Sequence, residues 1–104
     1  MDYAMTIFLR FGALNSIINY INMNKINIHV DNEEGFRSAC CYGHKHIVEY
    51  LINLHKQPPY SKINIHACNE YGIRLAHLNG YKHIIKYLLS CGSYSKNYKY
   101  IIIL

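Results

Sequence analysis

The sequence predicts an all-α fold, a short α-solenoid in which helix–turn–helix units with hairpin arms stack on one another. The first observation is an internal repeat. Residues 25–51 and 62–88 match at 16 of 27 positions when they are aligned at an offset of 37 residues. The second observation is that glycines, small residues and apolar residues keep their places in both copies. The third is that each copy ends in a segment whose apolar residues recur at helical spacing.

This pattern divides the chain, a single repeat domain of 104 residues, into a degenerate unit, two full units and a stub. Ile17–Ile21 matches a segment present in both full copies, and Thr6–Phe11 can supply the first helix of a degenerate unit. Pro58 and Pro59 cannot continue a helix, so the first full unit contains an inserted surface loop. The predicted bounds are about 3–24 for the degenerate unit, 25–61 for the first full unit with its inserted loop at 56–61, 62–98 for the second full unit and 99–104 for the stub.

The first full unit shows the order of the elements. Apolar and polar residues alternate in Ile26–His29, which predicts an extended arm. Asp31–Gly35 is predicted to be a turn, and Gly35–Tyr42 a short helix. After a break at Gly43–Lys45, a longer helix is predicted at His46–His55. This helix is apolar on more than one face, so it needs stacked neighbours to bury it. Its apolar residues are Ile47, Val48, Leu51, Ile52 and Leu54.

The charge of the chain is unevenly distributed. The net charge is +5, and no acidic residue follows Glu70. A basic C-terminal third of this kind can attract nucleic acid or an acidic protein, although five charges make a weak electrostatic footprint. The basic residues after Glu70 are Arg74, Lys82, Lys86, Lys96 and Lys99. We do not expect nucleic acid to be the main partner.

The sequence predicts an intracellular protein. It has no apolar run of the roughly 20 residues that a membrane helix needs, and its first residues make a poor signal peptide. We therefore expect no membrane association, reduced cysteines and a location in the cytoplasm or nucleus. We expect a monomer, with association through Tyr100–Leu104 as an alternative, because this segment is apolar and uncharged.

The cysteines and histidines predict neither a metal site nor catalysis. The densest cluster contains Cys40, Cys41, His44 and His46, but its spacing does not fit the pairs that wrap a zinc ion. Catalysis by a cysteine and a histidine needs a cleft and an oxyanion site, and nothing in the sequence marks either. The glycines punctuate the repeat and form no phosphate-binding loop. We therefore expect no catalytic residue, no metal and no cofactor.

Three features of the units resemble the ankyrin repeat family. Gly80–Gly92 is similar to the second helix of that repeat with its closing glycine. Gly43-His44 resembles the turn between the two helices, and Ala39 and Ala76 stand where the family has a small residue of the first helix. The resemblance covers most of residues 13–92 and is firmest over 25–92.

The unit looks most like the divergent repeats of giant-virus ankyrin proteins, through the pattern Asn-Glu-x-Gly-x-Arg-x-Ala at 32–39 and 69–76. It departs from the family in two ways. The Thr-Pro-Leu-His signature is missing, and the spacing is 37 residues where about 33 is usual. Arg37 and Arg74 occupy roughly the place of the signature histidine. The hydrogen bonds of the signature must therefore be replaced, either by Glu34 or by these arginines.

The resemblance implies a non-catalytic protein–protein interaction module, a scaffold that would be directed at the host cell if the protein is viral. The family binds partners through the tips of its arms and the exposed side of its first helices. Carried onto this chain, the partner-binding residues are Asp31, Glu33, Glu34, Tyr42, Glu70, Tyr71, Leu75 and Leu78. The tips would form an exposed acidic edge beside an apolar shelf, which suits a basic or amphipathic partner. Two alternatives stay open: binding of nucleic acid or an acidic partner through the basic C-terminal third, and a truncated remnant without function.

Overall fold

Helices form almost all of the regular structure of this protein. The computed structural model describes residues 1–92 and 94, and within these residues it contains no strand. The predicted all-α class is therefore confirmed. The helices are α1 (Tyr3–Phe11), α2 (Leu14–Asn24), α3 (Val30–Tyr42), α4 (Lys45–Asn53), the short 3₁₀ helix η1 (Leu54–Lys56), α5 (Ala67–Leu78) and α6 (Lys82–Cys91).

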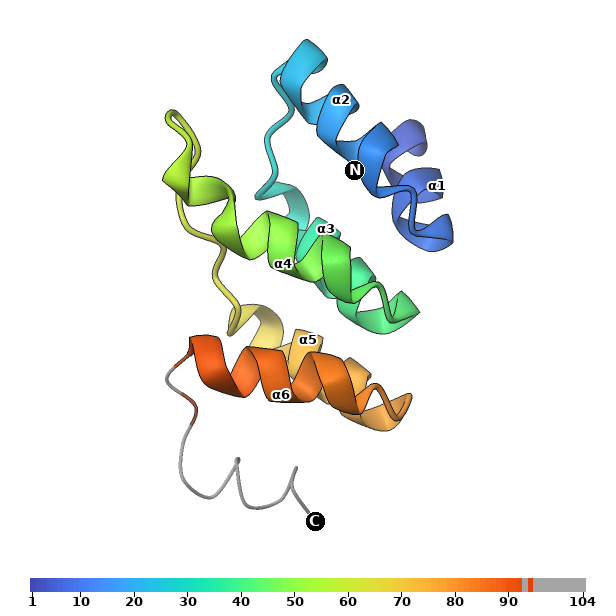
Figure 1. Cartoon of the computed structure of the whole chain (residues 1–104), viewed down its shortest axis with the longest axis vertical. Helices are drawn as coiled ribbons and strands as arrows, with labels where there is room; N and C mark the ends of the chain where they lie inside the picture. The colour runs from blue at the N-terminus through green and yellow to red at the C-terminus, as the bar shows by residue number, and fades with distance from the viewer. Residues whose placement is uncertain (93, 95–104) are drawn as a thin grey trace.

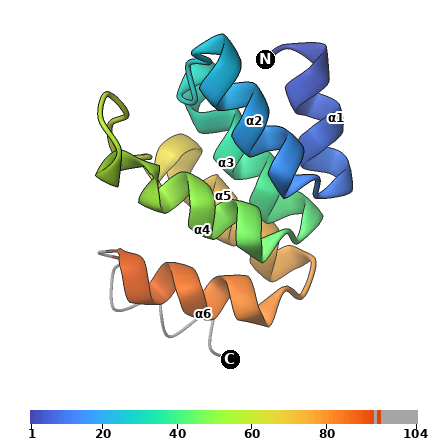
Figure 2. The same ribbon diagram turned by 45° about the horizontal axis from the view of Figure 1, so that its top comes forward.

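The helices are arranged as three antiparallel pairs that follow one another along the long axis of the molecule (Figure 1). Helix α3 packs against both α1 and α5, and α4 packs against α6. Helices α2, α4 and α6 lie in front in this view, while α3 and α5 lie behind them. A tilted view shows the same order of pairs (Figure 2). None of the described helices is both long and apolar enough to cross a membrane.

A glycine with a positive φ angle stands in the turn after the first helix of each described pair. Gly12, Gly43 and Gly80 have φ values of 72°, 79° and 76°. Glycine adopts this left-handed conformation without steric cost, because it lacks a Cβ atom. In each turn a backbone amide reaches back five residues, as in the bond of 3.1 Å from the amide of His44 to the carbonyl of Ala39. The chain can therefore reverse direction within two or three residues.

The core runs through all three pairs. Ala39 and Ala76 are completely buried, as expected for residues where two helices approach closely. The apolar face predicted for residues 46–55 is also buried, except that Ile52 is only half-buried. The largest fully buried side chains are Leu9, Ile17, Ile21, Phe36, Ile47, Leu51, Leu54, Ile73, Ile84 and Leu88. Since these residues come from all six described α-helices and from η1, the pairs share one core.

Several predicted boundaries differ from the structure. The second helix of the first full unit begins at Lys45 and ends at Asn53, and η1 follows it, so the inserted loop begins at Gln57. The arms at residues 26–29 and 63–66 are not part of a strand within the described residues, so they are single segments rather than paired hairpin strands. The end of the second full unit and the stub at 99–104, with Tyr100–Leu104, lie outside the described residues.

Candidate functional site

The predicted partner-binding residues begin at a turn of unusual backbone conformation, which occurs in both full units. The turn joins each arm to its first helix. Three successive residues, Asp31–Glu33, have φ angles of 55°, 55° and 64°, and their equivalents Cys68–Glu70 have 57°, 55° and 63°. Right-handed helix begins only after these residues. The left-handed conformation costs an L-residue about 1–2 kcal/mol, so contacts from other residues must offset it.

The repeated arginines supply part of that compensation. Arg37 donates from Nε to the carbonyl of Asn32 at 3.0 Å and from Nη2 to the carbonyl of Asp31 at 2.6 Å. Arg74 donates in the same way to the carbonyl of Asn69, at 3.3 Å. These carbonyls belong to residues of the turn. Hydrogen bonds from the arginines at the start of the first helix, one of the two possibilities that the sequence left open, are therefore present in both units. Glu34 instead has a carboxylate oxygen 3.9 Å from the amino group of Met1.

A histidine and a glutamate hold the two ends of each turn together. His29 Nδ1 lies 2.8 Å from Glu33 Oε1, and His66 Nδ1 lies 2.7 Å from Glu70 Oε1. Each histidine is oriented by its own arm, because its backbone amide donates to the side-chain oxygen of the asparagine two residues earlier, at 3.0 Å in both units. The repeated pentapeptide Lys-Ile-Asn-Ile-His thus has a structural role, because the hydrogen bonds of its asparagine and histidine stabilise the start of the turn.

Glu33 also joins the first full unit to the second. Its Oε2 accepts a hydrogen bond from the backbone amide of Asn64, in the next arm. His29 Nε2 lies 2.9 Å from the hydroxyl oxygen of Ser61, just before that arm. Glu33 is only 5% exposed. The predicted exposure of Glu33 at the arm tip is therefore wrong, because the neighbouring arm covers its carboxylate and uses it as an acceptor.

The other acidic residues of the predicted edge are also engaged within the fold. Asp31 is exposed, but its Oδ2 accepts from the amino group of Met1 at 2.8 Å, and this hydrogen bond holds the pKa of Asp31 below its usual value. Glu70 is partly exposed and bound to His66. The acidic edge therefore offers fewer carboxylates to a partner than the sequence suggests.

Two exposed tyrosines carry arginines over their rings. The guanidinium carbon of Arg10 lies 5.9 Å from the ring centre of Tyr42. Arg37 and Arg74 lie 5.7 Å and 5.9 Å from the ring centre of Tyr71, and so both contact one ring. Such contacts are favourable because the ring face is electron-rich. We call these five residues the arginine–tyrosine surface; they form two clusters, Arg10 with Tyr42 and the two other arginines with Tyr71.

Arg10 and Arg37 were not predicted to face a partner, whereas Arg74 was predicted only as part of the basic C-terminal third. The sequence offered one signal: Arg74 follows Tyr71 by three residues, which places both on one side of a helix. The predicted tyrosines are where the sequence analysis placed them. Tyr42 is 40% exposed and Tyr71 is 39% exposed.

The predicted apolar shelf continues from Tyr71 along α5. Leu75 and Leu78 follow it at intervals of four and three residues, so the three side chains share one side of the helix. Leu75 is half-buried, whereas Leu78 is 79% exposed. An exposed leucine next to an exposed tyrosine can supply the apolar centre of a binding surface.

The cysteine and histidine cluster serves the fold. Cys40 is fully buried, and burial raises the pKa of its thiol well above the usual range. His44 Nε2 lies 2.9 Å from the carbonyl of Arg10, which links the turn after α3 to the end of α1. Within residues 1–92 and 94, no group of three histidine, cysteine or acidic residues is placed to hold a metal ion.

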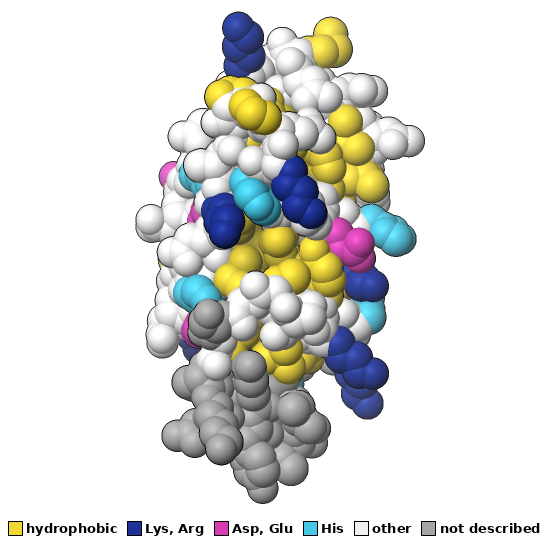
Figure 3. Space-filling model, turned by 60° about the vertical axis from the view of Figure 1, so that its left-hand side comes forward, with side chains coloured by type: hydrophobic (Ala, Val, Ile, Leu, Met, Phe, Trp, Pro, Cys, Tyr) yellow, Lys and Arg dark blue, Asp and Glu magenta, His cyan; other side chains and the backbone are white. Residues whose placement is uncertain are grey.

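The face of the molecule seen from the left of Figure 1 has a different character. Lysine, arginine and histidine side chains border patches of hydrophobic surface there, and acidic side chains are few (Figure 3). Of the basic residues predicted in the C-terminal third, Lys82 and Lys86 are exposed on α6. Lys96 and Lys99 lie outside the described residues.

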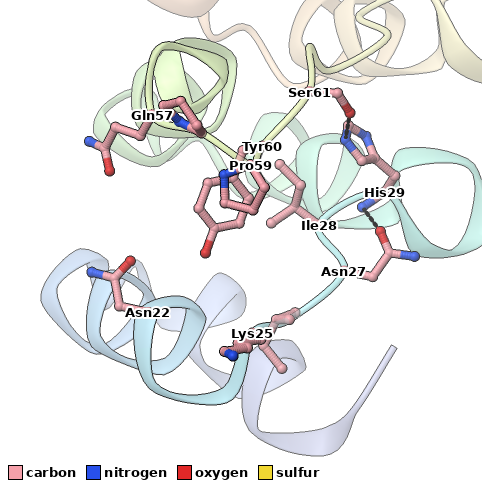
Figure 4. A pocket seen from close by; sticks show the side chains of 11 residues that line it. Asn22, Lys25, Asn27, Ile28, His29, Gln57, Pro59, Tyr60 and Ser61 are labelled. Carbon is pink, nitrogen blue, oxygen red and sulfur yellow. Dashed lines mark hydrogen bonds between the residues drawn. The ribbon is translucent and has the colours of Figure 1, made fainter.

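An open groove of about 630 Å³ lies between the first arm and the loop after η1. Pro59 and Tyr60 face Asn22 and Lys25 across it (Figure 4). Its rim carries amide side chains, including that of Gln57, and its floor is partly apolar. The groove can form hydrogen bonds with a polar ligand, but it holds no cluster of charges that would select one. Sequence analysis missed it because it depends on how the inserted loop folds over the arm.

Comparison of the chain with protein-family models, with curated proteins and with solved structures finds no match.

Proposed function

We propose that this chain is a non-catalytic protein-interaction module built of ankyrin-like repeats. The observation that carries the proposal is the arginine–tyrosine surface together with Leu78. Around Tyr71 it places guanidinium groups of α3 and α5 over an exposed ring, and the exposed Leu78 lies on the same side of α5. Tyrosine and arginine are enriched where proteins bind one another, because each combines a large contact area with polar groups.

The repeated architecture supports the ankyrin-like part of the proposal. Three helix pairs follow one another, and each described pair turns at a glycine of positive φ. The first helices, α1, α3 and α5, pack in a row. A row of equivalent helices presents an extended surface in which each unit contributes a few side chains, as in other repeat proteins.

Affinity capture with paired variants tests the proposal. Wild-type protein and the double variant Tyr71→Ala/Leu78→Ser are used as bait in extracts of the native cells. The matched control is Tyr3→Ala/Met23→Ser, since Tyr3 is 80% exposed and Met23 is 82% exposed, and neither belongs to the arginine–tyrosine surface. We expect a defined protein to be captured by the wild type and by the control, and to be lost with the Tyr71→Ala/Leu78→Ser bait.

Equal capture by both double variants would contradict the proposal. A further variant, Lys82→Gln/Lys86→Gln, tests binding through the basic C-terminal third. These lysines are exposed on α6, and no acidic residue follows Glu70 in the sequence. If only this variant loses its partner, binding through the basic face replaces the proposal.

A further inference from the structure

We infer that the arginine–tyrosine surface binds an acidic polypeptide segment that carries an aromatic or aliphatic anchor beside its carboxylates. The inference rests on the proposed function and adds the chemistry of the partner. It replaces the basic partner expected from the acidic edge, and it places an acidic partner, which the sequence left open only for the basic C-terminal third, on a different surface.

The first step concerns the positive charges. Arg10, Arg37 and Arg74 lie over exposed tyrosine rings, and Arg10 and Arg74 are themselves exposed, whereas Arg37 is half-buried. Within the described residues, no carboxylate lies within salt-bridge distance of these arginines. A guanidinium has five N–H donors in a planar fork that matches a carboxylate. The hydrogen bonds to the left-handed turns use only some of these donors.

The second step concerns the acidic residues nearby, which are bound to other groups of the same chain. Glu33 is buried against His29 and the amide of Asn64, and Glu70 is held by His66. Asp31 is close enough to Arg37 to be influenced by its charge, but its carboxylate accepts from the amino group of Met1. The acids of the turn therefore form ion pairs with other groups and, within the described residues, none with the arginines, so a partner's carboxylates can pair with the guanidinium groups.

The third step concerns the apolar part of the surface. Tyr71, Leu75 and Leu78 span two turns of α5, a strip about 10 Å long at 1.5 Å per residue. Leu78 exposes 79% of its area, which an apolar anchor would cover. A nucleic acid backbone would use the arginines but gain little from this strip. The combination of leucine, tyrosine and arginine therefore fits a polypeptide better than a nucleic acid.

Synthetic copolymers provide probes of defined chemistry. Binding of fluorescently labelled poly(Glu,Tyr), poly(Glu), poly(Lys,Tyr) and oligo(dT) to the full chain is measured by anisotropy at fixed salt. We expect poly(Glu,Tyr) to bind more tightly than poly(Glu), because its tyrosines supply the anchor, and poly(Lys,Tyr) to bind weakest, because its charge is repelled.

Matched charge variants locate the site. Arg10→Gln/Arg74→Gln should weaken poly(Glu,Tyr) binding at least about tenfold, since two charge-assisted contacts are lost. Lys82→Gln/Lys86→Gln removes the same charge from exposed positions on α6 and should leave binding within about twofold. Arg37 is kept, because it makes two hydrogen bonds to its left-handed turn, at 3.0 and 2.6 Å, whereas Arg74 makes one, at 3.3 Å. Thermal unfolding followed by circular dichroism identifies any variant whose binding falls through loss of folding.

The outcomes separate the inference from the proposed function. Tighter binding of poly(Lys,Tyr), lost in Leu78→Ser, would overturn the acidic chemistry but leave a protein-binding surface in place. Tighter binding of oligo(dT), lost in the arginine variant, would replace the polypeptide with a nucleic acid. If the wild type bound none of the probes, the inference would be wrong. The proposed function would fail with it only if native-cell capture were also insensitive to Tyr71→Ala/Leu78→Ser.

Discussion

Gly35 and Gly72 occupy the same place in the two full units but have different surroundings. A Cβ atom added at Gly72 would lie 2.6 Å from Cε2 of Phe36, a fully buried ring. A Cβ atom at Gly35 would find nothing closer than Leu9 Cδ1 at 4.0 Å. The glycine of the second unit is therefore required for close packing of α3 on α5, whereas that of the first unit is not.

This difference predicts opposite effects of one substitution. Gly35→Ala should raise the free energy of unfolding by about 0.5–1 kcal/mol, because alanine loses less conformational entropy in a helix. Gly72→Ala should lower it by about 1–3 kcal/mol, because the methyl group overpacks against Phe36. Urea unfolding of both variants measures the two values. Equal changes would mean that α3 and α5 do not approach as closely as the structure shows.

The burial of Glu33 shows where prediction from sequence fails at this scale. A glutamate in a polar turn is expected to be exposed. Its recurrence as Glu70 in the second unit does not show whether the position serves the fold or a binding surface. The covering group is the amide of Asn64, which lies 31 residues away. Hydrogen bonds from Arg37 at the start of the first helix could be predicted, because its contacts are to residues five and six positions earlier in the chain. Local partners can be predicted from a sequence, whereas distant ones need the fold.

A variant of Glu33 tests its role between units. In Glu33→Gln the side chain keeps its shape but has only one oxygen, so it cannot accept from both His29 and Asn64. The free energy of unfolding should fall by about 1.5–3 kcal/mol, the range for hydrogen bonds to a charged group. Glu34→Gln is the control, because the side chain of Glu34 is 39% exposed, and its effect should stay within about 0.5 kcal/mol. Similar small losses in both variants would show that Glu33 does not join the units.

At the scale of elements, the left-handed turn is the part that periodicity did not reveal. Helix positions followed from apolar spacing and from the glycine turns, and the boundaries of the second helices lie close to those predicted. Three consecutive non-glycine residues of positive φ are too rare to expect from composition. They persist here because histidine, glutamate and arginine contacts hold each turn.

Two exposed cysteines allow a direct test of the turn. Cys68 has a φ angle of 57°, and Cys91 is the last residue of α6. Cys68→Gly should raise the free energy of unfolding by about 1 kcal/mol, because glycine removes the steric cost of the left-handed conformation. Cys91→Gly should not raise it, because glycine is a poorer helix former. Thermal melts of both variants under reducing conditions provide the comparison. A loss of stability in Cys68→Gly would contradict the left-handed assignment.

At the scale of the whole molecule, the helix pairs depend on one another. Phe36 and Cys40 of α3 are fully buried, and both contact the position of Gly72 in α5. The arm before α5 supplies the backbone amide of Asn64, which donates a hydrogen bond to Glu33. The arginine–tyrosine surface also crosses this boundary, because Arg37 of α3 lies over Tyr71 of α5. The all-α class could be predicted from the repeat, but this shared surface could not, because it requires knowledge of which side chains meet across two units.

The central claim is that neighbouring pairs stabilise each other, and a fragment of residues 1–61 tests it most directly. This fragment lacks α5 and α6, so it would expose Phe36 and Cys40 and leave the buried carboxylate of Glu33 without the Asn64 amide. Circular dichroism at increasing temperature is measured for the fragment and the full chain at equal concentration. The account predicts that the fragment loses most of its helicity per residue and its cooperative melt. A fragment that kept full helicity and melted cooperatively at the temperature of the full chain would contradict it.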